Sequence, residues 1–256
     1  LPGGKIAINR GLLVELQDEA ELAAVLGHEI VHAAARHGAQ GMERGMLIQG
    51  ALATTAVVAG QSEYTGLAVG AASVGANLIN QRYSRDAELE SDYYGMVYMQ
   101  RAGYDPGAAV DLQDTFVRLS RGRDENWLSG LFASHPPSPE RVERNRQTAR
   151  AMGQGGRRGR EEYQRAIAGL QRDKPAYAAY AEGRALLDKS PEKALVLADK
   201  AIAIQPREAL FQGLRGDALA ARGRDKEARA AYDKAVALDD SFFRHYLQRG
   251  RLEQKM

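Results

Sequence analysis

A spacing of 34 residues recurs in the last third of the chain. Four positions, three of them occupied by alanine, have counterparts 34 residues further on: Ala194 and Ala228, Ala198 and Tyr232, Ala201 and Ala235, Pro206 and Asp240. Three glycines keep nearly the same step: Gly183, Gly216 and Gly250. A period of this length fits one helix–turn–helix unit, whose small residues let neighbouring helices pack closely. The region therefore predicts stacked pairs of helices, with a helical bundle that lacks repeats as the alternative.

This period is typical of tetratricopeptide repeats. Two repeats and a final helix make a short array, which we expect to depend on the preceding domain for stability. A segment rich in Gly and Arg around residues 153–160 precedes the array and predicts a solvated linker. We therefore expect a first domain at residues 1–152, a linker and connecting helix at 153–173, and a repeat domain at 174–256.

The charge balance and the missing cysteines exclude several classes of function. The formal net charge is +2, whereas nucleic-acid binding needs a concentrated basic face. We therefore expect no nucleic-acid partner. The chain contains no cysteine, which excludes disulfides, thiolate metal ligands and a cysteine nucleophile.

The first domain is predicted to be mainly helical with a small β-sheet. Residues 5–9 alternate in polarity and predict a short strand. If this strand lies at a sheet edge, an extended substrate can add to it, and Ala7 and Asn9 are then the expected backbone contacts. Residues 46–79 are rich in Ala, Gly and Val. They predict two buried helices, and a hairpin on a membrane surface is the alternative.

The chemistry is concentrated in His28-Glu29-Ile30-Val31-His32. This stretch belongs to a predicted helix with Asp18 as its N-cap and Gly38 as its end. His28 and His32 are four residues apart and share one helical face, so both imidazoles can reach one zinc ion. Glu29 is then the candidate general base, because zinc lowers the pKa of a bound water to about 7.

Two imidazoles need a third protein ligand, and three residues downstream are candidates. His37 does not fit the metzincin spacing, which would require histidine where the chain has Gly38. It is expected to support the site instead. Glu88 and Asp92 share a helical face. We expect Glu88 to bind the metal and Asp92 to orient a ligand. A solvated position is expected for Glu90.

His135 lies between Ser134 and Pro136, in a segment that cannot be helical just before the proline. Three roles remain open for it on these grounds alone. It is a zinc ligand of a resting state, a hydrogen-bond donor in the transition state, or a turn residue.

Two stretches resemble a known family. The first is residues 27–37, which begins with Gly27, contains the His28–His32 motif and ends with Arg36-His37. The second is residues 83–92, which read Tyr-Ser-Arg-Asp-Ala-Glu-Leu-Glu-Ser-Asp. The chain resembles the HtpX/BepA-like minigluzincin zinc peptidases, which are related to the CAAX prenyl proteases. Residues 1–6 and the Ser-His-Pro segment at 134–136 also resemble motifs of that family. The periplasmic branch with C-terminal tetratricopeptide repeats matches nearly the whole chain.

The resemblance implies a bacterial zinc endopeptidase of the periplasm, with one zinc per chain, that acts on misfolded or stalled envelope proteins. Polypeptides are the implied substrates, and envelope assembly proteins are the implied partners of the repeats. Peripheral association with a membrane is compatible with this reading. In that branch a histidine at the place of His135 approaches the zinc and keeps the enzyme latent. The family also carries elements before the Leu-Pro-Gly-Gly segment, which are expected to be missing here. The competing hypothesis is a plugged protease that serves as a chaperone-like scaffold for binding proteins.

Overall fold

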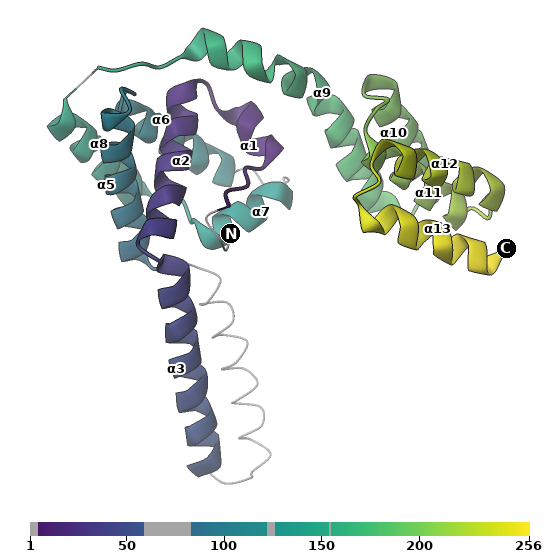
Figure 1. The fold of residues 1–256 in the computed structure, drawn as a ribbon, viewed down its shortest axis with the longest axis horizontal. Helices are drawn as coiled ribbons and strands as arrows, with labels where there is room; N and C mark the ends of the chain where they lie inside the picture. The colour runs from purple at the N-terminus through teal and green to yellow at the C-terminus, as the bar shows by residue number, and fades with distance from the viewer. Residues whose placement is uncertain (1–4, 59–82, 122–125, 154) are drawn as a thin grey trace. The chain divides into compact units, whose positions relative to one another are not determined.

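The computed structural model describes residues 5–58, 83–121, 126–153 and 155–256, and this part of the chain is mainly helical, as predicted (Figure 1). It divides into two compact units, Leu1–Ile167 and Ala168–Met256. The helices of the first unit are α1 (Arg10–Glu15), α2 (Glu19–Ala34), α3 (His37–Val58), α5 (Arg85–Arg101), α6 (Gly107–Ser120), α7 (Asn126–Ser134) and α8 (Pro139–Met152). Helix α9 (Arg160–Leu186) contains the boundary, and the second unit continues with α10 (Pro191–Ile204), α11 (Ala209–Ala221), α12 (Asp225–Leu238) and α13 (Phe243–Lys255).

The predicted small sheet is not seen in the described part of the chain. Residues 5–9 form no strand, and the one bridge recorded there joins Tyr104 to Arg157. A strand needs a hydrogen-bonded neighbour, and no described segment pairs with residues 5–9 as a strand. The segment instead leads into α1, where the side chain of Asn9 caps the helix by accepting from the Gly11 amide at 2.7 Å.

Helix α2 begins after the N-cap that the sequence predicts, and it ends before the predicted end at Gly38. Oδ1 of Asp18 accepts a hydrogen bond of 3.0 Å from the Glu21 amide, which makes Asp18 the N-cap. The helix ends at Ala34, because Arg36 adopts a φ of 58°, which breaks the helical path. Gly38 lies in α3 and does not terminate α2.

Residues 46–79 were predicted to form two buried helices, and the described part confirms a helix but not its burial, since Met46 and Leu47 are exposed. Residues 46–58 belong to α3, whereas 59–79 lie outside the described residues. Among the described helices, none is sufficiently long and apolar to cross a membrane. Helix α7 ends at Ser134, so His135 is not helical just before Pro136, as predicted.

Glycines set the distance between α2 and α5, which pack against each other. A Cβ atom on Gly27 would lie 2.8 Å from the carbonyl oxygen of Gly95, and a Cβ on Gly95 would lie 2.9 Å from the backbone nitrogen of His28. Only residues without a side chain allow two backbones to come this close. The two helices that carry the predicted metal ligands therefore cross at their glycines.

The Gly- and Arg-rich segment is bound to the first unit and is not a solvated linker. The Arg157 amide donates to the Gly103 carbonyl at 2.8 Å. The Arg158 guanidinium donates to Asp18 and to Asp111, each at 2.8 Å. Ion pairs and backbone hydrogen bonds attach the segment to the first unit, and the composition of the segment does not reveal either kind of contact.

In the second unit, small residues lie at the helix contacts. The side chains of one core cluster are buried: Ala194, Leu195, Ala218, Leu219, Ala228, Ala231, Tyr232 and Leu252. Helix α11 contacts both α10 and α12, and α13 contacts α12. Such sequential contacts agree with helical repeats, and their assignment as tetratricopeptide repeats stays a prediction.

Candidate metal centre

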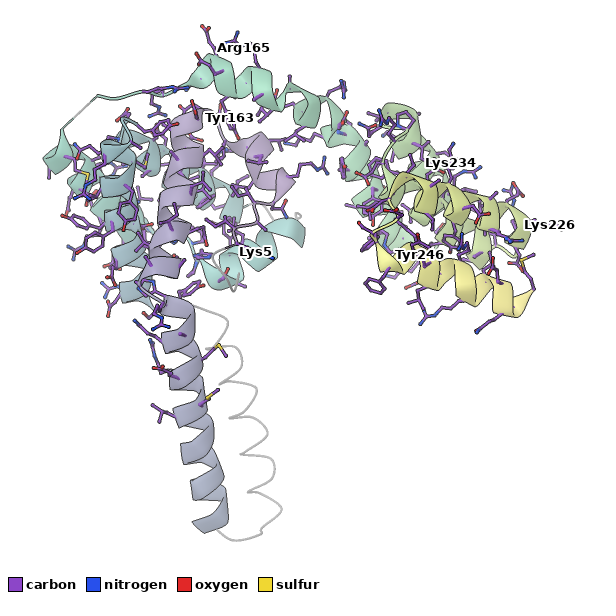
Figure 2. The ribbon with its side chains drawn as sticks, viewed as in Figure 1. Lys5, Tyr163, Arg165, Lys226, Lys234 and Tyr246 are labelled. Atoms are coloured by element: carbon purple, nitrogen blue, oxygen red, sulfur yellow. The ribbon has the colours of Figure 1, made fainter. Side chains whose placement is uncertain are left out.

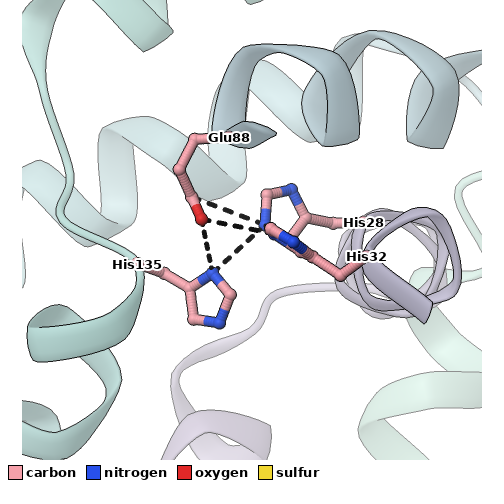
Figure 3. Close-up of side chains that lie close together, drawn as sticks. All are labelled: His28, His32, Glu88 and His135. Carbon is pink, nitrogen blue, oxygen red and sulfur yellow. Dashed lines mark hydrogen bonds and ion pairs between the residues drawn. The ribbon is translucent and has the colours of Figure 1, made fainter. Parts of the chain in front are cut away.

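Two helices carry the three metal ligands that the sequence predicts. His28 and His32 lie one turn apart on α2, and Glu88 lies in the first turn of α5, which Ser84 caps by accepting from the Ala87 amide. The close crossing of α2 and α5 turns these side chains toward one another (Figure 3).

The ligand atoms converge on one point. Nε2 of His28 and Nε2 of His32 are 3.0 Å apart. Oε1 of Glu88 lies 3.2 Å from Nε2 of His32, and Oε2 lies 3.5 Å from Nε2 of His28. His32 and Glu88 are buried. The structure thus brings together His28 and Glu88, which are 60 positions apart in the sequence. The shared helical faces had marked both as candidate ligands.

His135 is a fourth member of this cluster. Its Nδ1 lies 2.9 Å from Oε1 of Glu88 and 3.3 Å from Nε2 of His28. The residue follows the end of α7, and its amide donates to the Leu131 carbonyl at 2.8 Å. One ligand atom from each of the four side chains lies within 4.8 Å of every other, so the four could hold a metal ion.

The spacing and chemistry of these donors fit zinc. In a tetrahedral site with bonds of about 2.0–2.1 Å, neighbouring ligand atoms lie about 3.3 Å apart. Five contacts among these side chains, made through both oxygens of Glu88, measure 2.9–3.5 Å and lie around that value, and all four donors lie within 4.8 Å of one another. Oε2 of Glu88 is also buried without a hydrogen bond, since its 2.6 Å approach to Arg141 is an ion pair without hydrogen-bond geometry. Imidazole nitrogens and a carboxylate are zinc's usual ligands.

Asp92 fixes the orientation of His28. Its Oδ1 lies 2.9 Å from Nδ1 of His28, which leaves Nε2 free to face the cluster. Arg141, on α8, in turn donates two hydrogen bonds to Asp92, and its Nη1 reaches the Pro136 carbonyl at 3.3 Å. Sequence reasoning missed Arg141, because it is one of four arginines in a strongly charged helix.

His37 supports His32 in a similar way. The two Nδ1 atoms are 2.9 Å apart, so one of them donates to the other. Nε2 of His37 lies 3.3 Å from Oε2 of Glu90, a half-exposed side chain that the sequence placed in solvent. Glu90 is thus exposed, as predicted, and it also reaches back to His37, a contact that the sequence did not predict. Tyr83, also missed, has its ring centroid 3.9 Å from that of His32.

Glu29 lies beside the four candidate ligands. Its Oε1 is 3.5 Å from Nε2 of His135, and its side chain is 32% exposed, which leaves it open to solvent. Glu29 and His135 also line a pocket whose wall includes the apolar side chains of Met96, Leu112 and Phe116. The Glu29 carboxylate and two of the candidate ligands, His28 and His135, therefore line the same apolar recess.

The charges of the cluster stabilise its carboxylates. Burial alone would raise the pKa of Glu88, but hydrogen bonds from His135 and His32 and the charges of His28 and Arg141 hold it well below its usual range. Burial lowers the pKa of His32, against the effect of its hydrogen bond to Glu88. An ionised carboxylate beside a neutral imidazole is the state that a metal site needs.

The remaining predicted residues, Ala7 and Asn9, lie in the segment that leads into α1. Asn9 caps α1, as described above, and Ala7 is exposed. Their proposed contacts with an extended substrate stay a prediction.

Comparison with known proteins finds similarity to metallopeptidases, which agrees with the candidate metal centre. The model of peptidase family M48 matches residues 1–149. The chain is 33% identical over 141 residues to the mitochondrial metalloendopeptidase OMA1 of Arabidopsis thaliana, which is 55% of this chain and 27% of that protein. It is 32% identical over 146 residues to the metalloprotease YcaL of Escherichia coli, with 56% and 54% covered.

A third relative is a beta-barrel assembly-enhancing protease, the type of protein to which the sequence motifs already pointed. The chain is 28% identical over 162 residues to the beta-barrel assembly-enhancing protease of Escherichia coli, covering 59% of this chain and 31% of that protein. The matched part spans between about a quarter and just over half of the three relatives.

Proposed function

The chain belongs to peptidase family M48, and we propose on that premise that it is a zinc-dependent metalloendopeptidase. The observation that carries the proposal is the meeting of His28, His32, Glu88 and His135 next to Glu29. The reaction is the hydrolysis of peptide bonds inside a polypeptide.

We assign zinc, one per chain, to His28, His32 and Glu88. When bound there, zinc supplies a Lewis acid that polarises a peptide carbonyl and makes a water molecule more acidic. In the resting protein, His135 takes the fourth place. A site closed by four protein ligands behaves as a structural one, whereas catalysis needs an open position. Movement of His135 would then turn the resting form into an active one.

Glu29 is the proposed general base. It removes a proton from the attacking water and later delivers a proton to the amine nitrogen of the leaving peptide. Its position one residue after His28 places it beside the ligands without being one of them. The partial exposure of its side chain, quoted above, is consistent with a group that exchanges protons with water and substrate.

The residues behind the ligands keep them in place. Asp92 accepts from Nδ1 of His28, which selects the tautomer whose Nε2 can bind a metal. Nδ1 of His37 contacts Nδ1 of His32, which likewise leaves Nε2 of His32 facing the cluster. Arg141 holds Asp92 and compensates the negative charge that Glu88 and Asp92 bring into the interior.

The finer assignments follow from the relatives. We propose that the substrates are misfolded or stalled bacterial envelope proteins in the periplasm, because one relative is named for β-barrel assembly. We also propose that the second unit is a tetratricopeptide-repeat domain that recognises envelope assembly proteins, because its helices stack at the predicted period. The alternative is a permanently plugged protease acting as a scaffold, which the contact between His135 and Glu88 supports.

Metal analysis combined with a casein assay tests this function. We expect about one zinc per chain, release of casein fragments, loss of cleavage with a chelator and recovery when zinc is added. Glu29→Gln should retain the zinc and lose the cleavage. Cleavage that persists in chelator would contradict the proposal. Zinc binding without any cleavage, even after His135→Ala, would favour the scaffold.

A further inference from the structure

The apolar recess beside Glu29 contains a polar side chain, Gln113, that the proposed reaction does not use. Gln113 belongs to α6, and four residues of that helix line the recess at the i, i+3, i+4 and i+7 spacing of one helical face: Ala109, Leu112, Gln113 and Phe116. The three apolar members are buried, as a stripe that faces the core should be. Gln113 is buried as well, with 3% of its surface exposed. The wall that α6 contributes to the recess therefore has one amide group among apolar side chains.

The amide of Gln113 is not fully paired within the chain. Its Oε1 atom is buried and has no hydrogen-bond partner in the described part of the structure. Such an atom is rare in folded proteins, because it loses its hydrogen bonds to water and gains none in return. A methionine, which is equally long and unbranched, would fill the same place without that loss. A group that lowers stability in this way is typical of a position that serves binding.

The recess that Gln113 lines reaches the groups that would act on a peptide bond. It is also lined by His28, Glu29 and His135. Apart from Asn145, its remaining polar side chains contact the candidate metal centre. The recess lies inside the first unit, whose side chains occupy the space between its helices (Figure 2). A substrate residue next to the cleaved bond could therefore place its side chain in the recess while its backbone faces the metal centre.

The lining of the recess favours an aromatic ring with a polar end. Met96 and Met99 line it from α5, and Phe116 lines it from α6. Thioether side chains adapt to a ring and make favourable contacts with its edge, and two aromatic rings pack well at an angle. The amide of Gln113 needs a partner that a plain hydrocarbon ring lacks. A phenolic hydroxyl both donates and accepts hydrogen bonds, so it can pair with either end of an amide.

We propose that the recess binds a tyrosine side chain of the substrate, next to the cleaved bond, and that Gln113 selects tyrosine over phenylalanine. This inference rests on the proposed peptidase function. Phenylalanine would fill the recess but leave the buried amide unpaired. A site built to bond a hydroxyl discriminates against a substrate that lacks it, because the polar group of the site then loses its partner. A charged side chain would lose its hydration among the apolar walls.

Two unstructured peptides that differ only in one central residue, tyrosine or phenylalanine, test the proposal. With the zinc-loaded full chain, we expect kcat/KM for cleavage beside that residue to be at least about tenfold higher for tyrosine. Gln113→Met should reduce this ratio to near one by slowing cleavage of the tyrosine peptide. The same variant should unfold at an equal or higher temperature, because it removes an unpaired amide. Gln147→Met is the matched control, since Gln147 is exposed on α8 and should leave the ratio unchanged.

A binding measurement separates this proposal from the peptidase function. The Glu29→Gln chain should bind the tyrosine peptide at least about tenfold more tightly than the phenylalanine peptide, and adding Gln113→Met should remove the difference. If this difference is found in a chain that cleaves neither peptide, the peptidase function fails and the assignment of the recess stands.

Two results would overturn the assignment of the recess. The first is equal cleavage of the two peptides or, in a chain without activity, equal binding. The second is a preference for tyrosine that survives Gln113→Met, which would show that a water molecule or another side chain meets the hydroxyl. Gln113→Leu replaces the methionine variant if that variant does not fold, and the same outcomes apply to it.

Discussion

Arg141 donates two hydrogen bonds of 2.7 Å to Asp92, from Nε to Oδ2 and from Nη2 to Oδ1. Both side chains are buried. Burial would raise the pKa of Asp92, but the hydrogen bonds from Arg141 and His28 keep it below its usual range. Arg141 therefore contacts the candidate metal centre through Asp92, which faces Nδ1 of His28.

Loss of Arg141 should be severe. Arg141→Met leaves two buried carboxylates without their cation, which we expect to lower the free energy of unfolding by about 3–5 kcal/mol. Zinc affinity should fall about 10- to 100-fold, because Asp92 then no longer holds His28. The control is Arg144→Met, an exposed position of the same helix. Urea unfolding and zinc titration check both effects, and equal results for the two variants would refute the role.

The crossing of α2 and α5 gives a second prediction. Gly95→Ala places a methyl group 2.9 Å from the backbone nitrogen of His28. The helices must then separate, at a cost of about 1–3 kcal/mol, and the ligands separate with them. Gly41→Ala, in α3, meets nothing within 4 Å and should be neutral or slightly stabilising. Thermal unfolding and zinc content distinguish the two. A Gly95→Ala protein with unchanged zinc affinity would contradict this account.

Sequence reasoning located the features that depend on local pattern. Asp18 was recognised as a cap because a cap needs only the residue and its position before the helix. His28 and His32 were paired by helical spacing, and Glu88 was chosen over Glu90 by the face it shares with Asp92. In the structure, the side chains of these three proposed ligands lie together.

The features that were missed depend on tertiary contacts. The Gly27–Gly95 approach joins residues that no local periodicity connects. Arg141 could not be distinguished from its neighbours, because only the fold decides which arginine faces Asp92. Arg158 was assigned to solvent from its glycine-rich context, yet its partner Asp18 lies 140 residues away in sequence. A sheet was expected from one strand-like segment, although pairing cannot be read from one segment alone.

The third prediction compares two glutamates on α5. Glu88→Gln removes a proposed ligand and should reduce bound zinc from about one per chain to a small fraction. Glu90→Gln should retain most of the zinc, because Glu90 contacts His37, which only supports His32. Metal analysis after dialysis measures both. Equal loss in the two proteins would remove Glu88 from the ligand set.

Glu21 should make stability depend on pH. Burial, opposed by the hydrogen bond from the Gln17 amide, raises the pKa of Glu21 from 4.5 to about 7. The folded state therefore holds a proton that the unfolded state releases. This contribution is complete below pH 4.5 and is lost as the pH rises through about 7. Between pH 5 and 8, the loss should be of the order of 2–3 kcal/mol. In urea unfolding experiments, the free energy of unfolding of Glu21→Gln should fall less between pH 5 and 8 than that of the unmodified chain. An equal fall would contradict the raised pKa of Glu21.

The last prediction concerns latency. Nδ1 of His135 lies 2.9 Å from Glu88 and 3.3 Å from His28, and we propose that the ring takes the place that an incoming water would need. Because His135 follows the end of α7, it can leave without unfolding α2 or α5, which carry the other ligands. His135→Ala should therefore increase cleavage of casein while zinc remains near one per chain. Adding Glu29→Gln should abolish the gain.

Ser134→Ala is the matched control for that loop, since the Ser134 hydroxyl bonds to the Leu131 carbonyl and not to the ligands. It should leave cleavage at the level of the unmodified chain. If His135→Ala instead loses activity and keeps its zinc, the imidazole stabilises the transition state and does not close the site. If both activity and zinc are lost, His135 is a structural ligand. The three roles thus give different pairs of zinc content and cleavage rate, because only a removable ligand blocks water without being needed to hold the metal.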